Sequence, residues 1–533
     1  MMNQPLLIST IIEHAAAQNG ETEIVSRETH GPVFRYSVAD CAVRAKKLAN
    51  ALADFGLDLG SVAGTLAWNN HRHVEIYYAV SGSGLIVHTC NPRLHLDQLI
   101  YIVNHAEDRI LFFDVTFAPL IACIAGLCPH VRAWICMSDA ENMPALDGVA
   151  NIYCYETLIA SQSEEFTWPT FDEHAAAAIC YTSGTTGNPK GALYSHRSIV
   201  LDAMTICMPA ALSLSPRETI LPVVPMFHIN GWCIPYGCFI GGSKLVLPGC
   251  RLDGAGLYEL LENERVTVSA GVPTVWLQLL QYVEQHNLRF SSLRRVTSGG
   301  SAVPLAMIAK FDGLGIEVRQ GWGMTETTAV ATMSCATAEQ LTWEPAQRHA
   351  AAANCGKPVF GVEIKVVDAE GAPLPRDGRS QGELMVRGHW IISSYYKNDT
   401  SPLKDGWFPT GDIATIDPHG VLQIRDRVKD LIKTGGEWIS SIDLENTAIG
   451  HPSVAAAAVI GVKHPKWQER PLLFVVLKPG HTLEQPDILA FLADRMAKWW
   501  VPEEVIFLES LPVGGTGKVQ KTVLREKYGN IFD

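Results

Sequence analysis

Residues 181–191 read YTSGTTGNPKG and directly follow the apolar run AAAAIC at 175–180. This stretch holds three glycines, three threonines, a serine and a lysine. A buried strand that opens into such a loop suits phosphate binding, because glycines let backbone N–H groups point inward, hydroxyls add donors and lysine adds positive charge. A flexible surface linker is the alternative, but linkers rarely follow a buried strand and carry a lysine in this arrangement. The stretch therefore predicts a phosphate-binding loop at the end of a strand.

The two commonest nucleotide-binding motifs do not fit this sequence. Five positions after Gly184, where a P-loop needs its second glycine, stands Pro189, and Gly191 follows Lys190 in place of Ser or Thr. The stretch GWGMTE at 321–326 misses the dinucleotide fingerprint, because Glu326 occupies the place of the third glycine. A phosphate site of another kind is expected.

The composition is that of a globular protein of more than one domain. The chain has 533 residues, of which 47% are hydrophobic and 18% charged, and this length exceeds what one hydrophobic core usually serves. The net charge of −13 argues against general nucleic-acid binding. No secretory signal or transmembrane segment is evident, and the thirteen cysteines form no CxxC pair. These features predict a cytoplasmic protein whose cysteines are mostly small buried hydrophobes.

Patterns along the chain predict an α/β fold with two domains. Between 244 and 320 short apolar runs alternate with helical patterns such as PTVWLQLLQYVEQH, which indicates a mostly parallel sheet covered on both faces. After about Gly356, alternating strands such as GELMVRG are separated by turn signals. A mixed α+β tail follows. We expect a large multi-subdomain N-terminal domain at 1–428, with mostly parallel sheets and a β-rich subdomain, and a small mobile C-terminal domain at 429–533.

Five ordered motifs identify the chain as a member of a known superfamily. Together they resemble the adenylate-forming enzymes, which include acyl-CoA synthetases, peptide-synthetase adenylation domains and luciferases. VVPMFHINGWCIP at 223–235 and GGEWISSIDLEN at 435–446 look most similar to medium- and long-chain fatty acyl-CoA synthetases. The five motifs are YTSGTTGNPKG (181–191), GWGMTET (321–327), YYKND with DGWFPTGD (395–412), RDRVKDLIKTGGEWIS (425–440) and GGTGKVQKTVLRE (514–526).

The resemblance implies a two-step reaction that uses ATP, Mg²⁺ and coenzyme A. A carboxylate attacks the α-phosphorus of ATP, which releases pyrophosphate and forms an acyl-adenylate. The thiol of coenzyme A then attacks the acyl carbon and releases AMP. Because the carboxylate and the triphosphate repel each other, the first step needs positive charge and a metal where negative charge accumulates.

The resemblance also assigns the catalytic residues. Lys518, in a glycine-rich loop, is expected to bridge the carboxylate and the α-phosphate; the alternative is a solvated surface lysine. The family often has a basic residue and a Thr-Ser pair before this loop, whereas Val513, Gly514 and Gly515 stand here, which leaves one fewer charge. Glu326 is expected to bind Mg²⁺ with the Thr182 hydroxyl, although an acid there could instead cap a helix.

The nucleotide is expected to contact several segments at once. Asp412 in the PTGD motif is assigned to the ribose hydroxyls, with Arg427 assisting at the ribose and phosphates. A backbone-lined slot for adenine is expected at 299–301, beside Trp322 and Trp438, although either tryptophan could be a core aromatic. The predicted nucleotide-binding residues are Thr182, Ser183, Gly184, Thr185, Thr186, Gly187, Lys190, Gly299, Gly300, Ser301, Gly321, Trp322, Gly323, Thr325, Asp412, Arg427, Lys433 and Trp438.

One C-terminal domain serving two half-reactions must rotate between them. Lys429 falls where the family has its hinge, so Lys518 is expected to face the site in the first step. The face of the C-terminal domain near Gly435 and Gly436 is expected to turn toward the active site for the coenzyme A step.

The stretch PMFHINGW lies where the family's acid substrate meets the nucleotide. His228 is placed beside the passage between the acyl and coenzyme A sites, and Trp232 resembles the indole gate of a fatty-acyl tunnel; each could instead be a core residue. Phe227 and Val272 would add apolar lining. No acidic residue near this motif could hold a substrate ammonium, which favours an acid with a plain apolar acyl group.

These inferences predict an ATP-dependent fatty-acid–CoA ligase of the AMP-forming type for medium- to long-chain acids. A ligase for another small apolar acid, such as a thioether or aryl acid, is the enzymatic alternative. A non-catalytic adenylate-fold binding protein is the alternative from another class. The expected partner is a small carboxylic acid, with a homodimer considered and no nucleic acid.

Overall fold

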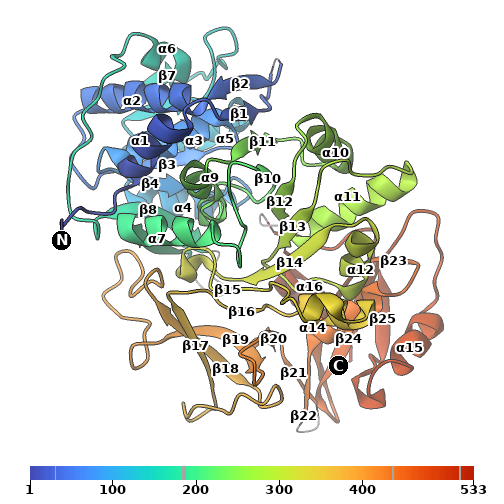
Figure 1. Cartoon of the computed structure of the whole chain (residues 1–533). Helices are drawn as coiled ribbons and strands as arrows, with labels where there is room; N and C mark the ends of the chain where they lie inside the picture. Colours follow the sequence, from blue (N-terminus) through green and yellow to red (C-terminus); the bar gives the residue numbers. More distant parts are fainter. Residues whose placement is uncertain (31, 183–187, 435–436, 515–517, 533) are drawn as a thin grey trace.

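The computed structural model describes residues 1–30, 32–182, 188–434, 437–514 and 518–532. These residues form four sheets with helices packed around them (Figure 1). The first three sheets belong to the N-terminal part of the chain, and the fourth belongs to the C-terminal part.

The first sheet has seven strands in the order β7-β6-β5-β3-β4-β8-β9. All neighbours pair in parallel except β8 and β9, which pair antiparallel on either side of the predicted phosphate loop. The loop therefore begins and ends on two paired strands at the edge of this sheet. The strands are β3 (Val62–Leu66), β4 (Ile86–Thr89), β5 (Ile110–Phe113), β6 (Ala133–Cys136), β7 (Ile152–Cys154), β8 (Ala176–Thr182) and β9 (Lys190–Ser195).

The second sheet has nine strands in the order β16-β15-β14-β13-β12-β10-β11-β1-β2. Its central strands, from β14 to β1, are parallel, and antiparallel strands close both ends. The predicted strand and helix alternation between 244 and 320 is thereby confirmed. The strands are β1 (Glu23–Ser26), β2 (Phe34–Ser37), β10 (Thr219–Pro222), β11 (Lys244–Leu247), β12 (Val268–Gly271), β13 (Arg295–Ser298), β14 (Glu317–Trp322), β15 (Thr332–Met333) and β16 (Lys357–Pro358).

Helices cover both parallel sheets, as hydrophobic strands require. The helix over 273–285 begins at Pro273, because proline is well tolerated in the first turn where its missing N–H needs no partner. Helices α1, α2, α3, α7 and α9 contribute to one buried cluster with strands of both sheets. The helices of this part are α1 (Ile8–Asn19), α2 (Val38–Asp54), α3 (His71–Gly82), α4 (Leu96–Ala106), α5 (Ala118–Ile124), α6 (Tyr155–Ala160), α7 (His196–Ile206), α8 (Ile229–Trp232), α9 (Ile234–Gly241), α10 (Gly254–Asn263), α11 (Pro273–Gln285), α12 (Leu305–Gly313) and α13 (Pro345–Ala352).

The third sheet is the predicted β-rich subdomain. Its four strands are antiparallel, in sequence order, and its apolar face joins the same buried cluster. The strands are β17 (Val362–Val367), β18 (Gly382–Gly388), β19 (Phe408–Ile416) and β20 (Leu422–Arg427).

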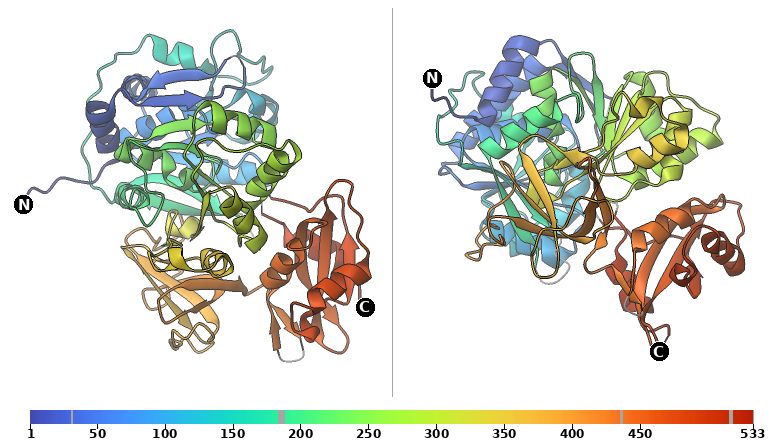
Figure 2. Two further views of the ribbon diagram at one scale, coloured as in Figure 1. Left: turned by 45° about the vertical axis from the view of Figure 1, so that its right-hand side comes forward. Right: turned by 60° about the horizontal axis from the view of Figure 1, so that its bottom comes forward.

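The C-terminal part packs around a separate sheet and separate hydrophobic clusters. Residues 428–431 join β20 to β21, and both views in Figure 2 show the C-terminal part as a distinct body beside the third sheet. The exact domain division at Lys429 stays a prediction. The elements are β21 (Ile432–Thr434), β22 (Glu437–Ile439), α14 (Ser441–Ile449), β23 (Val454–His464), β24 (Gln468–Leu477), α15 (Gln485–Ala493), β25 (Glu504–Phe507) and α16 (Lys521–Tyr528).

One predicted helix is shorter than its sequence pattern suggests. The stretch QPDILAFLADRMAKWW at 485–500 was expected to be a single helix, but α15 ends at Ala493 and Lys498–Trp500 forms a separate 3₁₀ turn. The Arg470 side chain donates hydrogen bonds to the carbonyls of Trp499 and Val501. These tertiary bonds hold the end of the segment away from a continued helix. Among the described residues, no helix combines the length and apolar character that a bilayer span requires.

Candidate active site

The carboxyl ends of the central parallel strands form the floor of the site. Ligands of open α/β sheets usually bind at this edge. Val272, Gly299 and Gly300 directly follow β12 and β13, and Gly321 lies near the end of β14. A Cβ atom added to Gly299 would lie 3.0 Å from the Gly321 carbonyl oxygen and 3.3 Å from the Trp232 ring. Main chain and an indole ring therefore approach Gly299 closely, and the adenine slot at 299–301 stays a prediction.

Lys518 reaches this floor from the C-terminal part of the chain. A Cβ added to Gly300, whose φ is +84°, would lie 3.3 Å from the Lys518 Cε atom and 3.5 Å from Val272 Cγ1. The Gly514 N–H donates a hydrogen bond to the Lys518 carbonyl at 2.7 Å, which ties the lysine to the start of its own loop. Lys518 is thus partly buried beside Gly300 in this structure, and its catalytic role stays a prediction.

Burial and neighbouring charge both act on Lys518. Burial lowers the pKa of the Lys518 ammonium to about 8, and the positive charge of Arg427 acts in the same direction. Asp412 and Glu326 oppose this shift in pKa, so both carboxylates lie within electrostatic range of the lysine. Arg427, Asp412 and Glu326, predicted for the phosphate, ribose and metal roles, therefore all lie within electrostatic range of Lys518.

Asp412 is held by two of the predicted nucleotide residues. Its carboxylate accepts a hydrogen bond from Trp322 Nε1 at 2.9 Å and pairs with Arg427 Nε at 3.0 Å. The Asp412 side chain is 4% exposed, whereas that of Arg427 is 43% exposed. The Trp322 indole thus holds one oxygen of the buried Asp412 carboxylate, and the partly exposed Arg427 guanidinium holds the other.

Glu326 lies in a short 3₁₀ turn, η3 (Thr325–Thr327), which contacts β8. Its Oε1 atom accepts a hydrogen bond from the Tyr395 hydroxyl at 2.7 Å. Burial raises the pKa of the Glu326 carboxyl, while Tyr395 and the nearby cations Arg427 and Lys518 oppose that rise. The alternative, in which Glu326 caps a helix, finds no support in the structure, because the Glu326 side chain bonds to Tyr395. A buried carboxylate with nearby hydroxyls is a fitting oxygen ligand for Mg²⁺.

The two ends of the predicted phosphate loop pair with each other, and β9 contacts the turn that carries Glu326. The Thr182 hydroxyl lies 3.4 Å from the Lys190 carbonyl oxygen, and Lys190 Nζ lies 5.2 Å from the centre of the Tyr395 ring. The Thr325 carbonyl accepts a hydrogen bond of 2.7 Å from the Tyr194 hydroxyl of β9. Ser183, Gly184, Thr185, Thr186 and Gly187 lie outside the described residues, so their predicted contacts stay predictions.

On the predicted acyl side, His228 directly precedes a turn of left-handed backbone that contains Trp232. Residues 229–233 have φ angles of 48°, 46°, 62°, 56° and 55°. This turn directs the Trp232 ring toward Gly299. Burial and then the Lys518 charge lower the pKa of His228 to about 3, so His228 is neutral at physiological pH. Phe227 is buried and its ring contacts that of Trp68.

For some predicted residues, the described part of the chain shows no hydrogen bond or ion pair with this cluster. Lys433 and Trp438 lie on the β21–β22 hairpin, where the Lys433 ammonium sits 5.1 Å from the centre of the exposed Trp438 ring. Lys429 is exposed between the third and fourth sheets, and Ser301 is exposed beside the floor. Gly323 is confined by packing, since a Cβ there would lie 1.8 Å from the Ala329 carbonyl oxygen. Gly435 and Gly436 lie outside the described residues.

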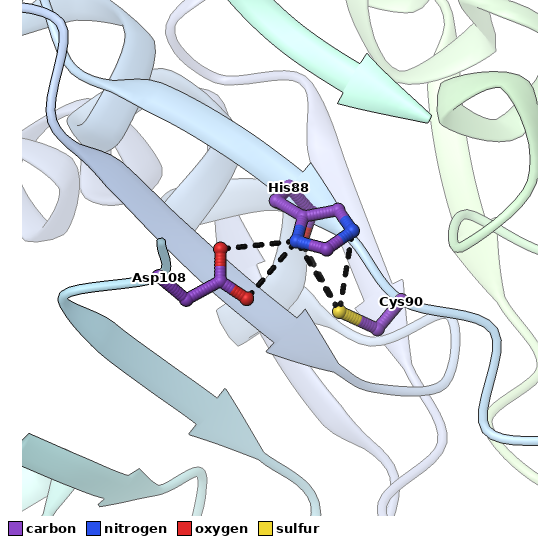
Figure 3. A group of neighbouring side chains, drawn as sticks. All are labelled: His88, Cys90 and Asp108. Carbon is purple, nitrogen blue, oxygen red and sulfur yellow. Dashed lines mark hydrogen bonds and ion pairs between the residues drawn. The ribbon is translucent and has the colours of Figure 1, made fainter. Parts of the chain in front are cut away.

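A second cluster of potential metal ligands lies inside the first sheet. His88, Cys90 and Asp108 are fully buried, and His88 Nδ1 lies 3.0 Å from both Asp108 carboxylate oxygens (Figure 3). Burial raises the pKa of the Cys90 thiol well above its ordinary value. The His88 ring packs 4.9 Å from that of Tyr181, the residue that precedes Thr182. The cluster therefore satisfies its own polar groups and supports the strand that leads into the phosphate loop.

Sequence reasoning assigned no role to Tyr395, although it quoted the YYKND motif that contains this residue. A tyrosine in a polar motif gives no sign of its partners. Tyr395 contacts Glu326 and Lys190, and these two residues lie in segments that are far from Tyr395 and from each other in the sequence.

Comparison with known proteins identifies the family. The model of the AMP-binding enzyme family matches residues 12–396, and that of the AMP-binding enzyme C-terminal domain matches residues 443–518. The chain belongs to the AMP-binding enzyme family. The resemblance to adenylate-forming enzymes is thereby confirmed.

Three relatives align over the whole chain. The medium-chain-fatty-acid–CoA ligase of Ectopseudomonas oleovorans is 49% identical over 100% of this chain and 98% of its own length. The 3-methylmercaptopropionyl-CoA ligase of Ruegeria lacuscaerulensis is 48% identical over 99% and 98%. The long-chain-fatty-acid–CoA ligase of Thermus thermophilus is 43% identical over 100% and 97%. These relatives confirm the expected likeness to medium- and long-chain fatty acyl-CoA synthetases.

A solved structure confirms the fold. The anthranilate CoA ligase AuaEII, solved in complex with anthranoyl-AMP, superimposes with a TM-score of 0.88 at 24% identity, over 99% of this chain and 98% of that chain. The predicted α/β class with a large N-terminal and a small C-terminal part is therefore borne out.

Proposed function

We propose that the protein is an ATP-dependent, AMP-forming fatty-acid–CoA ligase for medium- to long-chain acids. The observation that carries this proposal is the meeting of Lys518 with the floor at Gly300, within electrostatic range of Glu326, Asp412 and Arg427. A protein that only bound nucleotide would have no need for a lysine delivered from another part of the chain. The names of the relatives support the choice of substrate class.

In the first half-reaction, a carboxylate oxygen attacks the α-phosphorus and the bond to pyrophosphate breaks. The Lys518 ammonium would meet negative charge from both reactants, and charge placed in advance lowers the barrier without reorganisation. Asp412 would accept the ribose hydroxyls, held in place by Trp322. Glu326 and Thr182 would hold Mg²⁺, which would offset the charge of the phosphates.

In the second half-reaction, the coenzyme A sulfur attacks the acyl carbon, AMP leaves and the thiol proton is released. His228 is neutral and adjoins the acyl side, so it adds no cation that would compete with Lys518. Rotation of the C-terminal part about Lys429 would remove Lys518 and bring the face at Gly435 and Gly436 to the site. Trp232, Phe227 and Val272 would line the acyl passage.

The chief rival is a ligase for a short thioether acid. It is favoured by the 3-methylmercaptopropionyl-CoA ligase relative, whose identity of 48% nearly equals the 49% of the medium-chain enzyme. Overall identity therefore does not separate the two substrates.

A substrate panel tests the proposal. Pyrophosphate release would be measured with Mg-ATP and carboxylates from acetate to palmitate, including phenyl and thioether acids, with and without coenzyme A. The proposal expects release that peaks with medium or long chains and becomes catalytic only with coenzyme A. A peak at the thioether acid would favour the rival, and ATP binding without release for any acid would favour a non-catalytic binder. We further propose a cytoplasmic location and leave a homodimer as a prediction for sedimentation analysis.

A further inference from the structure

Tyr395 connects three parts of the site that are distant in sequence. Its hydroxyl donates to Glu326 Oε1 at 2.7 Å, and its ring faces the Lys190 ammonium at 5.2 Å. Lys190 closes the phosphate loop, and Glu326 is the acid assigned to Mg²⁺. A single side chain therefore touches both the cation of the loop and the carboxylate of the metal site.

Main-chain contacts hold Tyr395 in this place. Its backbone bridges to Ala192 of β9, and the next N–H, that of Tyr396, donates to the Gly191 carbonyl at 2.8 Å. Three residues earlier, the Ile392 N–H donates to the Glu326 carbonyl at 3.0 Å. The segment 392–396 is thus fastened at one end to η3 and at the other to β9, so the Tyr395 hydroxyl is fixed toward Glu326.

The hydrogen bond changes what Glu326 can offer to a cation. Within the described part of the chain, Tyr395 is the one side chain that donates a hydrogen bond to Glu326. Because Oε1 has one lone pair engaged in that bond, Oε2 is the less encumbered oxygen for a metal. Mg²⁺ requires near-octahedral geometry and binds through few carboxylate oxygens, whereas Ca²⁺ takes six to eight ligands and accepts bidentate carboxylates.

We propose that Tyr395 is a positioning residue that keeps Glu326 a one-oxygen ligand and so favours Mg²⁺ over Ca²⁺ in the nucleotide site. The inference rests on the proposed function, since it takes Glu326 as the metal ligand. The phenol holds the carboxylate through one oxygen, and its ring keeps Lys190 beside the same site.

The test compares Tyr395→Phe with Tyr396→Phe. Tyr395→Phe keeps the aromatic ring facing Lys190 but removes the hydroxyl. Tyr396→Phe makes the same chemical change on the neighbouring residue, which gives no hydrogen bond to Glu326 among the described side chains. ATP binding would be measured calorimetrically without acid substrate, at matched Mg²⁺ and Ca²⁺ concentrations, and folding would be checked by thermal melting.

The wild type and Tyr396→Phe should bind ATP more tightly with Mg²⁺ than with Ca²⁺. In Tyr395→Phe the ratio of the two affinities should fall by about 10-fold or more, since loss of a ligand's hydrogen-bond partner typically changes metal affinity by about 10- to 100-fold. In turnover, the apparent KM for Mg²⁺ should rise more than kcat falls. A folded Tyr395→Phe whose ratio stays within twofold of wild type overturns the inference. Failure of the wild type to bind ATP with either ion would instead overturn the proposed function.

Discussion

The pKa of Lys518 predicts how adenylate formation depends on pH. The ordinary pKa of 10.5 is lowered to about 8 by burial and by Arg427. With that value, about nine in ten lysines are charged at pH 7 and about one in ten at pH 9. Since only the charged form can offset the negative charge of the reactants, activity should be lost over this interval. An unperturbed lysine would keep its charge throughout it.

The assay is pyrophosphate–ATP exchange with a preferred acid, from pH 7 to pH 10, at a Mg-ATP concentration well below its KM, so that kcat/KM reports the free enzyme. Without coenzyme A, the titration of its thiol does not enter the profile. The value of kcat/KM for the acid should be level near pH 7 and fall about tenfold per pH unit well above pH 8. Bound carboxylate and phosphates favour the charged lysine, so the fall in kcat should occur at higher pH than the fall in kcat/KM.

Lys518→Arg provides the decisive comparison. A guanidinium stays charged to beyond pH 12, so this variant should have a lower plateau but no fall between pH 8 and pH 10. Lys518→Met should lose exchange at every pH. The reasoning is refuted if the wild-type profile is flat to pH 10, or if Lys518→Arg keeps the same fall near pH 8.

Three further predictions follow from other parts of the fold. Gly300→Ala should lose about 1–2 kcal/mol of stability, because alanine is left-handed there, and should also lower exchange several-fold, because its Cβ would lie 3.3 Å from the Lys518 Cε atom. Gly315→Ala, at φ +75° with no atom within 4 Å of the added Cβ, should lose stability alone, and equal loss of exchange in both would contradict the argument. Lys429→Pro should spare exchange, because the Lys429 N–H makes no backbone hydrogen bond among the described residues, and it should block thioester formation, because proline stiffens the hinge. Equal loss of both half-reactions would speak against a hinge there. Burial raises the pKa of the Asp202 carboxyl from 3.8 to about 7. The contribution of Asp202 to wild-type stability should therefore fall as pH rises from 4 to 7. Over that range Asp202→Asn should gain stability relative to the wild type, by at most about 4 kcal/mol. Melting temperatures at pH 5 and pH 8 test this, and an equal offset at both would argue against it.

The alternation of short apolar runs and helical patterns predicted the parallel sheet, because these periodicities report directly on which faces are buried. Motifs and their order predicted Lys518, Glu326 and Asp412. The partners of these residues could not be predicted, since Trp322 meets Asp412 and Tyr395 meets Glu326 only after folding. The end of α15 at Ala493 was missed because it too depends on contacts made only after folding, those of Arg470 with Trp499 and Val501.

The left-handed turn at residues 229–233 bears on any attempt to alter the acyl preference. Four of its five residues carry side chains, and each L-residue in this conformation costs about 1–2 kcal/mol, which the surrounding packing must offset. Glycine would relieve that cost at any of these positions, whatever its effect on the acyl passage. A randomised library over Phe227–Cys233 would therefore select for conformational tolerance as well as for fit to the acid. Enrichment of glycine or asparagine there would report on the backbone, and only variants matched in melting temperature would reveal the pocket.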